Sequence, residues 1–546
     1  MMPPSTSSLV QRLAPAAFLV ALSGALFAYL LARFPYNGFY GQDAYAYFYQ
    51  AEALWRELTG QPQPPFALFS ANGLYWPVGY HLHLLPGFLL GWPDAGRVLT
   101  LALAALTPIL LYLVVGEVWY TARAGERMLA GVVAGVVMLF TGTYVRTGLS
   151  LMSDVPAVFW GTLSVYCCFR AWPPEERVSG ERANHLWALA AGLSLGVAVL
   201  VRYSSALLVP ALAVYVLVRL YSRKPRGFSQ DTGRTRAHWQ IGLSLVVVGV
   251  AVALLPQIAY SLTHAPGPAL RAWSLGNLFS NTVTGPDGTT TFAQPMIVFY
   301  LLGPLAGVDA GFLSPLYLAA FALGLWMLIL QRNLNILFLI VPLWFIGVLA
   351  YSGTNYQTHR FVLTFMPALA LLVGIGTSTA RSQLWFRARG GYAARRVRYI
   401  TTTLAAAFVL LGICLGLAQG WRSVEQWSAT HSAFNAQEQQ IVALAREAVG
   451  ATGEEGTPRV VCFGFSAPLY HYTRWPILDF FLHDEGDIRA FLAGPGPRLL
   501  VLPEESMSTR WAGTPTAARW QWIQSNYKLT RQGVSGGFTV YRVEDR

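Results

Sequence analysis

The chain contains a series of apolar segments of about twenty residues, separated by polar connections. A helix of about 20 residues crosses the hydrocarbon core of a bilayer, and residues 13–33 already form one such segment. We interpret it as a retained first helix and not as a cleaved signal, because it lacks a small-residue cleavage pattern. The further candidate spans are residues 97–118, 127–146, 155–171, 186–201, 205–221, 239–262, 311–331, 333–351, 359–378 and 400–420. We therefore predict an α-helical polytopic membrane protein with about eleven transmembrane helices.

The composition supports this class. Of the 546 residues, 54% are hydrophobic and 12% are charged, whereas soluble proteins carry about 25% charged residues. A net charge of +12 would suggest a nucleic-acid partner in a soluble chain. Here the arginines gather in connections between apolar segments, as the positive-inside rule describes. We therefore predict a lipid bilayer as partner and no nucleic acid.

Alternation of the spans assigns each connection to one side of the membrane. With a cytoplasmic amino terminus, the arginine-rich connections all lie in the cytoplasm, and they are residues 123–127, 170–182, 223–236 and 381–398. The polar connections then emerge on the opposite face, and they are the loop after the first span, residues 146–154, residues 202–203, residues 263–310 and residues 351–360. We interpret these connections as parts of one extracytoplasmic site.

The end of the chain has a different character. Residues 435–449 show helical spacing, and residues 459–464, 499–502 and 538–542 resemble short strands. About 120 residues are enough for a small domain with its own core. We therefore divide the chain into a transmembrane domain, residues 1–420, and an extracytoplasmic α/β domain, residues 421–546. The first loop, residues 34–96, belongs to the transmembrane domain and is expected to lie on the membrane surface with interfacial helices.

Asp43 is the leading candidate for a catalytic residue. It lies just after the first span in the aromatic stretch GQDAYAYFYQ, residues 41–50, where Tyr45, Tyr47 and Tyr49 could line a ligand pocket. A positioned carboxylate can accept the proton of an attacking hydroxyl. The alternative is an aspartate that caps a helix beginning near Ala44, and the residue alone leaves both interpretations open.

Three further charged residues lie at predicted span boundaries on the same face. Asp154 could position an acceptor, a metal or an arginine, or it could cap the helix that follows. Arg202 and Arg360 are costly at a boundary unless they are paired or functional, and their guanidinium groups suit phosphate. Snorkelling to lipid headgroups is the alternative for both arginines. The residues expected to complete a ligand pocket with Tyr45 and Tyr47 are Tyr80, His81, Tyr203 and His359.

In their order and membrane side, these motifs resemble the GT-C superfamily of membrane glycosyltransferases. The resemblance is strongest to the group with the protein O-mannosyltransferases and the lipid A aminoarabinose transferase. It rests on Asp43, on YWPVGY at residues 75–80, on Ser153-Asp154, on residues 192–203 and on residues 359–367. The resemblance implies an inverting enzyme that moves a sugar from a polyprenyl-phosphate-linked donor to an acceptor hydroxyl on the extracytoplasmic face. The acceptor would be a glycolipid, a glycan or a protein, and the membrane would be the cytoplasmic (inner) one in a bacterium.

The resemblance also implies residue roles. Asp43 would match the catalytic base, and Arg202 and Arg360 would match cations near the donor phosphate. In this group the first-loop acid is often followed by Glu, whereas Ala44 follows it here. No cofactor is therefore assigned, and a divalent metal is left open, with Asp43 and Asp154 as its ligands.

A flippase or transporter of a lipid-linked sugar is the alternative function. Transporters tend to carry ionisable residues near the middle of the membrane. In this chain the ionisable residues gather at one surface, which favours the transferase.

Overall fold

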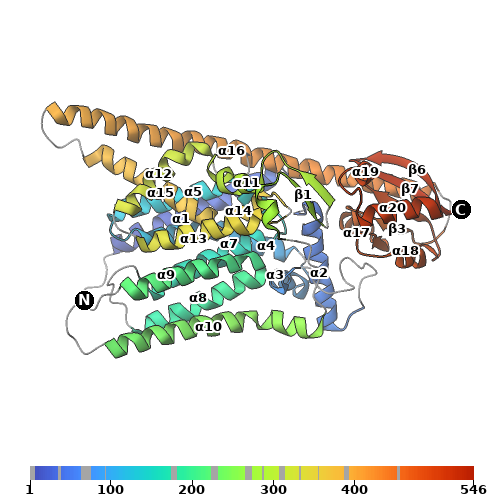
Figure 1. Ribbon diagram of the computed structural model, residues 1–546, viewed down its shortest axis with the longest axis horizontal. Coiled ribbons are helices and arrows are strands. Elements are labelled where there is room, and N and C mark those ends of the chain that lie inside the picture. Colours follow the sequence, from blue (N-terminus) through green and yellow to red (C-terminus); the bar gives the residue numbers. More distant parts are fainter. Residues whose placement is uncertain are drawn as a thin grey trace.

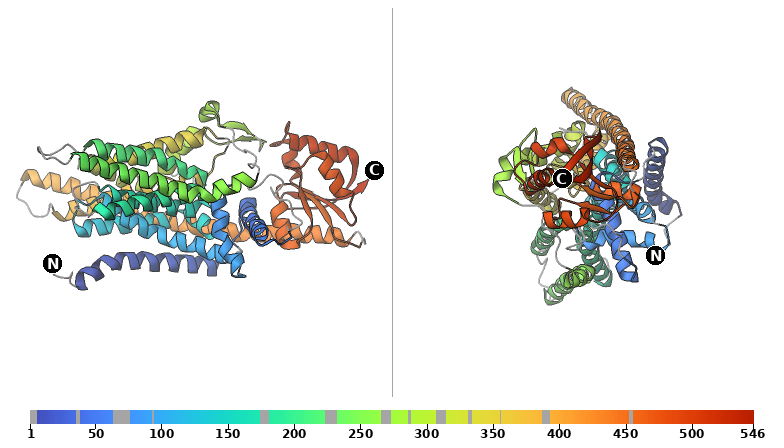
Figure 2. Two further views of the ribbon diagram at one scale, coloured as in Figure 1. Left: turned by 90° about the horizontal axis from the view of Figure 1, so that it is seen from below. Right: turned by 90° about the vertical axis from the view of Figure 1, so that its right-hand side faces the viewer.

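The computed structural model describes residues 6–34, 38–62, 76–92, 94–173, 181–222, 232–264, 273–285, 288–306, 314–330, 334–354, 356–386, 393–451 and 455–546. Long helices form a bundle, and a small α/β domain lies at one end of it (Figure 1). The views in Figure 2 agree with this arrangement and place the first helix at the edge of the bundle. We call the small domain, residues 455–546 with the end of the helix before it, the C-terminal domain.

The bundle helices overlap the predicted apolar segments, although residues 359–362, at the start of the predicted span 359–378, form a separate short helix. The bundle helices are α1 (Thr6–Arg33), α4 (Ala95–Val118), α5 (Ala124–Leu139), α7 (Asp154–Ala171), α8 (Glu181–Val201), α9 (Leu208–Ser222), α10 (Thr232–Thr263), α12 (Leu318–Leu330), α13 (Leu334–Ser352), α15 (Met366–Phe386) and α16 (Ala393–Gly450). Among the described residues, 5 helices are long and apolar enough to span a membrane. A sixth span results if α5 and α6 (Gly142–Leu149), which bend by 66°, are counted together. The predicted number of about eleven is therefore not confirmed, because several apolar helices are shorter than a full span.

Glycines allow some bundle helices to pack backbone against backbone. A Cβ atom at Gly376 of α15 would collide with the carbonyl oxygen of Ala320 in α12, and one at Gly324 would collide with that of Leu372. Small residues at such crossings let transmembrane helices approach closely, where van der Waals packing holds them together. The glycines of α12 and α15 thus allow these two helices to pack in close contact.

The first loop contains two helices, α2 (Gly41–Thr59) and α3 (Val78–Leu89). α2 lies between the bundle and the C-terminal domain (Figure 1). Its Tyr45 is fully buried and belongs to an apolar cluster that also contains Val201 from the bundle and Val460 from the C-terminal domain. Both domains therefore cover α2, and the position of this loop on the membrane surface stays a prediction.

Short elements occupy the same end of the bundle. They are η2 (Tyr203–Leu207), η3 (Leu275–Phe279), β1 (Thr282–Gly285), β2 (Gly288–Thr291), α11 (Met296–Ala306), η4 (Pro315–Tyr317) and α14 (His359–Val362). Strands β1 and β2 form an antiparallel hairpin. The backbone N–H of Thr289 donates a hydrogen bond of 2.8 Å to the carbonyl oxygen of Arg510. The hairpin therefore connects the bundle side to the C-terminal domain.

The C-terminal domain contains a five-stranded sheet of order β4-β3-β5-β7-β6. β3 is parallel to β4 and β5, while β7 is antiparallel to β5 and β6. The strands are β3 (Arg459–Cys462), β4 (Ile477–Asp479), β5 (Arg498–Leu502), β6 (Tyr527–Ser535) and β7 (Phe538–Asp545), and the helices are α17 (Ser466–Thr473), α18 (Glu485–Leu492), α19 (Glu504–Ser508) and α20 (Pro515–Asn526). The three strands predicted from the sequence are present, and β4 and β6 were not predicted. The predicted boundary at residue 421 falls inside α16, which runs without interruption from the bundle into this domain.

Candidate active site

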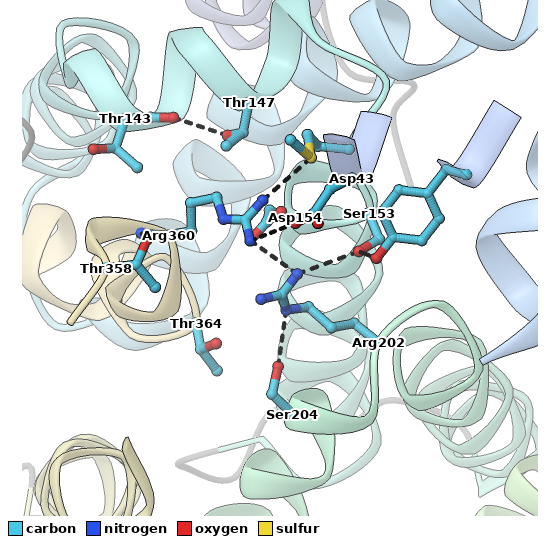
Figure 3. A network of polar contacts seen from close by, with 12 residues as sticks. Asp43, Thr143, Thr147, Ser153, Asp154, Arg202, Ser204, Thr358, Arg360 and Thr364 are labelled. Carbon is cyan, nitrogen blue, oxygen red and sulfur yellow. Dashed lines mark hydrogen bonds and ion pairs between the residues drawn. The ribbon is translucent and has the colours of Figure 1, made fainter. Parts of the chain in front are cut away.

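Asp43 and Arg360 form an ion pair at the end of the bundle that faces the C-terminal domain. Asp43 lies in the first turn of α2, and Arg360 lies in α14. Arg360 Nη2 is 2.9 Å from Asp43 Oδ2, and Arg360 Nη1 contacts the sulfur of Met152 at 3.3 Å (Figure 3). The Asp43 side chain is 41% exposed, against 18% for Arg360. Asp43 is therefore open to a ligand, while Arg360 is held in place behind it.

Asp154 and Arg202 form a second ion pair next to the first (Figure 3). Arg202 Nη1 is 3.0 Å from Asp154 Oδ1, and the Asp154 side chain is only 2% exposed. Arg202 also donates hydrogen bonds to the hydroxyls of Ser153, at 3.3 Å, and Ser204, at 3.1 Å. The Tyr47 hydroxyl shares a hydrogen bond of 2.9 Å with Ser153. Both arginines that the sequence placed at boundaries are thus paired with the two predicted acids.

The remaining predicted pocket residues lie elsewhere. The Tyr45 hydroxyl donates a hydrogen bond of 2.6 Å to Glu438 Oε2, on the α16 side of α2. Tyr80 and His81 are fully buried, with contacts to Thr100 at 3.1 Å and to Gln50 at 3.0 Å. Tyr203 is 54% exposed, and the ring of His359 packs on Phe299. Of the predicted aromatic residues, only Tyr47 joins the network of the two ion pairs.

A polar cavity of about 550 Å³ lies between the bundle and the C-terminal domain. Asp43 and Arg360 line it, and so do residues from both domains. The C-terminal domain contributes Phe463, Gly464, Asp479, Phe481, Arg510 and Trp511. The other lining residues are Tyr40, Gly41, Gln42, Asp43, Trp76, Arg146, Thr147, Ser150, Met152, Tyr356, Gln357, Thr358, Arg360 and Phe361. Its size is that of a pocket for a small organic ligand.

A second, narrower cavity of about 70 Å³ runs between the helices of the bundle. Aliphatic side chains of α4, α7, α13 and α15 form most of its wall, as Leu111 and Leu371 do. Its polar lining residues include Asp154, Arg202 and Arg360. Arg360 therefore borders both cavities, and the apolar one reaches the two ion pairs from within the bundle.

Asp479 is a cavity residue that the sequence analysis did not identify. It ends β4, which has only 3 residues, and it is 2% exposed. Its Oδ2 accepts hydrogen bonds from Ser466 Oγ at 2.7 Å and from Gln42 Nε2 at 3.4 Å, and its Oδ1 accepts one from the Phe481 N–H at 3.0 Å. Burial raises the pKa of Asp479 above its ordinary value. The available signal was a lone acid in the apolar stretch WPILDFF, residues 475–481.

The donor set does not fit a divalent metal. Asp43 and Asp154 are each ion-paired with an arginine. Among the described residues there is no group of three or more His, Cys, Asp or Glu side chains that could hold a metal ion. A metal site at Asp43 and Asp154 would also face the positive charges of Arg202 and Arg360.

Comparisons with known proteins concern the fold of the chain. Residues 95–264 match the family model for dolichyl-phosphate-mannose-protein mannosyltransferase. No curated protein sequence matches the chain. The structure of ArnT from Cupriavidus metallidurans bound to undecaprenyl phosphate is similar, with 13% identity over 97% of this chain and 98% of that chain and a TM-score of 0.58.

Two further solved structures are similar over most of the chain. The oligosaccharyltransferase of Archaeoglobus fulgidus, in its apo form, has 12% identity over 96% of this chain and 74% of its own, with a TM-score of 0.56. The arabinofuranosyltransferase AftD from Mycobacteria has 13% identity over 96% of this chain and 40% of its own, with a TM-score of 0.50. At these identities the likeness is one of fold.

Proposed function

We propose that this chain, which has the fold of the GT-C membrane glycosyltransferases, transfers a sugar from a polyprenyl-phosphate-linked donor to an acceptor hydroxyl. The observation that carries the proposal is that Arg360 borders both the apolar cavity and the polar cavity. A lipid-linked donor needs an apolar path for its chain and a cation at its phosphate, and a sugar acceptor or protein acceptor needs polar space beside them. These three requirements meet at one guanidinium group.

In this proposal, Arg202 and Arg360 hold the donor phosphate. Guanidinium groups present several N–H donors in a plane and bind phosphate oxygens in pairs. As the bond to the sugar breaks, negative charge builds up on the leaving phosphate, and fixed cations stabilise that charge. The Asp154 carboxylate lies 3.0 Å from the Arg202 guanidinium and keeps the Arg202 side chain directed at the site. Asp154 therefore orients Arg202, the residue that binds the phosphate, and does not itself react.

Asp43 is the proposed base. The acceptor oxygen attacks carbon 1 of the sugar from the side opposite the phosphate, and the carbon–oxygen bond to the phosphate breaks. The leaving polyprenyl phosphate keeps the electron pair of that bond, and the Asp43 carboxylate takes the hydroxyl proton. Attack from the opposite side inverts the configuration at carbon 1. The base must reach the acceptor oxygen on one side of carbon 1 while the cations reach the phosphate on the other, so the sugar would lie between the Asp43 carboxylate and the phosphate. The contact of 2.9 Å between Asp43 and Arg360 supports the assignment of both groups to one site.

The proposed location is the cytoplasmic (inner) membrane of a bacterium, with the site on the extracytoplasmic face. Arg123 and Arg170, which lie in two of the basic connections, are at the ends of α5 and α7 away from Asp154. Arg146, Arg202 and Arg360 line the two cavities at the site or just beneath it. The positive-inside rule then puts the Arg123 and Arg170 end in the cytoplasm and the C-terminal domain outside. The proposed acceptor is a glycolipid, a glycan or a protein.

The test is sugar transfer in membranes that contain wild-type protein or Asp43→Asn. Labelled polyprenyl-phosphate sugar is supplied, and labelled glycan, glycolipid and protein are measured separately. We expect Asp43→Asn to lose transfer by 10²-fold or more, while Glu57→Gln, at the far end of the same helix, keeps it. Retained transfer by a folded Asp43→Asn protein would remove the base assignment. Movement of the lipid-linked sugar across the membrane with no labelled product would instead favour a flippase.

A further inference from the structure

The transfer step leaves one carboxylate of the polar cavity without a role. Asp479 enters the cavity lining from the C-terminal domain, opposite the bundle, and is 2% exposed. No described residue forms an ion pair with it; its partners are a hydroxyl, a backbone N–H and an amide. A buried carboxylate without a cation is unfavourable for stability. Its presence in the cavity wall therefore calls for a role in binding.

The hydrogen bonds of Asp479 leave it able to accept another. Two oxygens accept about four hydrogen bonds, and the described residues supply three, of which the one from Gln42 is long at 3.4 Å. Ser466 and Phe481 hold the carboxylate from behind, within the C-terminal domain. An incoming hydroxyl can therefore bind Asp479 without displacing the two shorter contacts.

Gln42 links Asp479 to the proposed base. Gln42 precedes Asp43 in the first turn of α2, and its amide reaches Asp479 across the domain boundary. The two carboxylates thus flank one glutamine on the wall of one cavity. A ligand with several hydroxyls could present one to Asp43 and another to Asp479.

The other cavity walls suit a carbohydrate. Neutral hydrogen-bonding side chains and aromatic rings line them beside Arg146 and Arg510, and they include Thr147, Ser150, Gln357, Tyr40 and Trp76. Carboxylates and amides accept hydrogen bonds from neighbouring ring hydroxyls, and aromatic faces pack on the C–H groups of a sugar. A volume of about 550 Å³ bounded by two domains admits a small ligand, or the end of a chain. A peptide acceptor would instead be expected to use strand pairing, and β2 of the nearby hairpin already donates Thr289 N–H to Arg510.

We propose that Asp479 binds a hydroxyl of a carbohydrate acceptor and so places the reacting hydroxyl of that acceptor at Asp43. The inference rests on the proposed function and adds the acceptor class to it. Asp479 is an acceptor-binding residue, and Ser466 positions it. The C-terminal domain is then half of the acceptor site and not merely a cover.

The test measures binding separately from transfer. Purified full-length protein is mixed with a panel of methyl glycosides and disaccharides and with a Ser/Thr-containing peptide, and binding is followed by saturation-transfer NMR. We expect at least one glycoside to bind the wild type, and Asp479→Asn to weaken that binding by about tenfold to a hundredfold. Glu485→Gln, an exposed acid of the same domain, is the matched control and should bind as the wild type does.

Two further variants keep the test decisive. Ser466→Ala leaves the carboxylate in place but removes its hydrogen bond of 2.7 Å, so it should weaken binding by less than Asp479→Asn and answers the question if the latter does not fold. Asp43→Asn should lose transfer but weaken glycoside binding by less than Asp479→Asn does, so a failed base assignment and a failed acceptor site give different results. Equal glycoside binding by wild type, Asp479→Asn and Ser466→Ala would overturn the proposal. Binding of the peptide and of no glycoside would also overturn it.

Discussion

The Asp43 carboxylate and the Arg360 guanidinium lie 2.9 Å apart, although 317 residues of chain separate them. The contact joins α2, which the C-terminal domain covers, to α14, which leads into the bundle helix α15. A proposed base and a proposed phosphate ligand are therefore held together by two different parts of the fold. The geometry of this pair should matter as much as its charge.

Arg360→Lys tests this point. Lysine keeps the positive charge but cannot offer two N–H groups in one plane to the phosphate and a third to Asp43. We expect kcat/KM for the donor to fall by about 10- to 100-fold, with a larger loss for Arg360→Ala. The measurement is a donor titration of sugar transfer. Arg56→Lys, which changes the partly buried pair with Glu52 within α2, should leave the titration unchanged, and an equal effect of both lysine variants would contradict the phosphate role.

The Asp154–Arg202 pair should respond as a unit. Its carboxylate side chain is 2% exposed, and the loss of one partner from a buried pair leaves an uncompensated charge, which costs about 3–5 kcal/mol. Asp154→Asn and Arg202→Gln should each lower the unfolding temperature, and the double variant should recover part of that loss. Transfer should stay low in all three variants, because the donor phosphate has lost Arg202 or its orientation. Thermal unfolding in detergent and the transfer assay check this, and additive temperature losses in the double variant would contradict it.

The sequence was sufficient for the apolar helices and for the gathering of the charged residues at one end of the bundle. Apolar runs are local, and alternation brings Asp43, Asp154, Arg202 and Arg360 to one end of the bundle. Their pairing, Asp43 with Arg360 and Asp154 with Arg202, was not predictable, because it depends on how distant helices approach each other. The number of spans was also not predictable, because an apolar run can form a short or bent helix.

Helical spacing could have separated the tyrosines of α2. Asp43 and Tyr47 are four residues apart, as are Tyr45 and Tyr49, so each pair shares a helix face. Tyr47 contacts the ion-pair network, whereas Tyr45 and Tyr49 contact Glu438 and His471 of the C-terminal side. Asp479 could not be placed, because its strand has 3 residues and its partners lie in another domain.

The contact between Tyr49 and His471 should make the domain interface sensitive to pH. The Tyr49 hydroxyl lies 2.7 Å from His471 Nδ1, and burial together with the nearby Arg474 lowers the pKa of His471 to about 4. In the unfolded chain histidine has a pKa near 6.5. The stabilising contribution of neutral His471 is therefore fully present above about pH 6.5 and is lost as the pH falls toward 4.

We expect the unfolding temperature of the wild type to fall between pH 7 and pH 5 by more than that of His471→Gln. The amide side chain keeps a hydrogen-bond acceptor for Tyr49 but does not titrate. Differential scanning fluorimetry of the full chain at both pH values measures the difference. His483→Gln, which replaces a histidine near Asp487 on the same domain, is the control and should follow the wild type. Identical pH slopes for wild type and His471→Gln would show that this interface does not titrate.

Gly288 should be required for docking of the β1–β2 hairpin on the C-terminal domain. Its φ angle is +84°, and a Cβ atom there would collide with the carbonyl oxygen of Arg510, beside the hydrogen bond from Thr289. Gly288→Ala should therefore push the hairpin away from Arg510 and open the cavity wall. Gly537→Ala is a close control, because Gly537 has a similar φ of +79° but no atom within 4 Å of its Cβ position. Hydrogen exchange at residues 288–291 should increase in Gly288→Ala and not in Gly537→Ala, and equal exchange in both would mean that backbone strain alone, and not contact with Arg510, is the important effect.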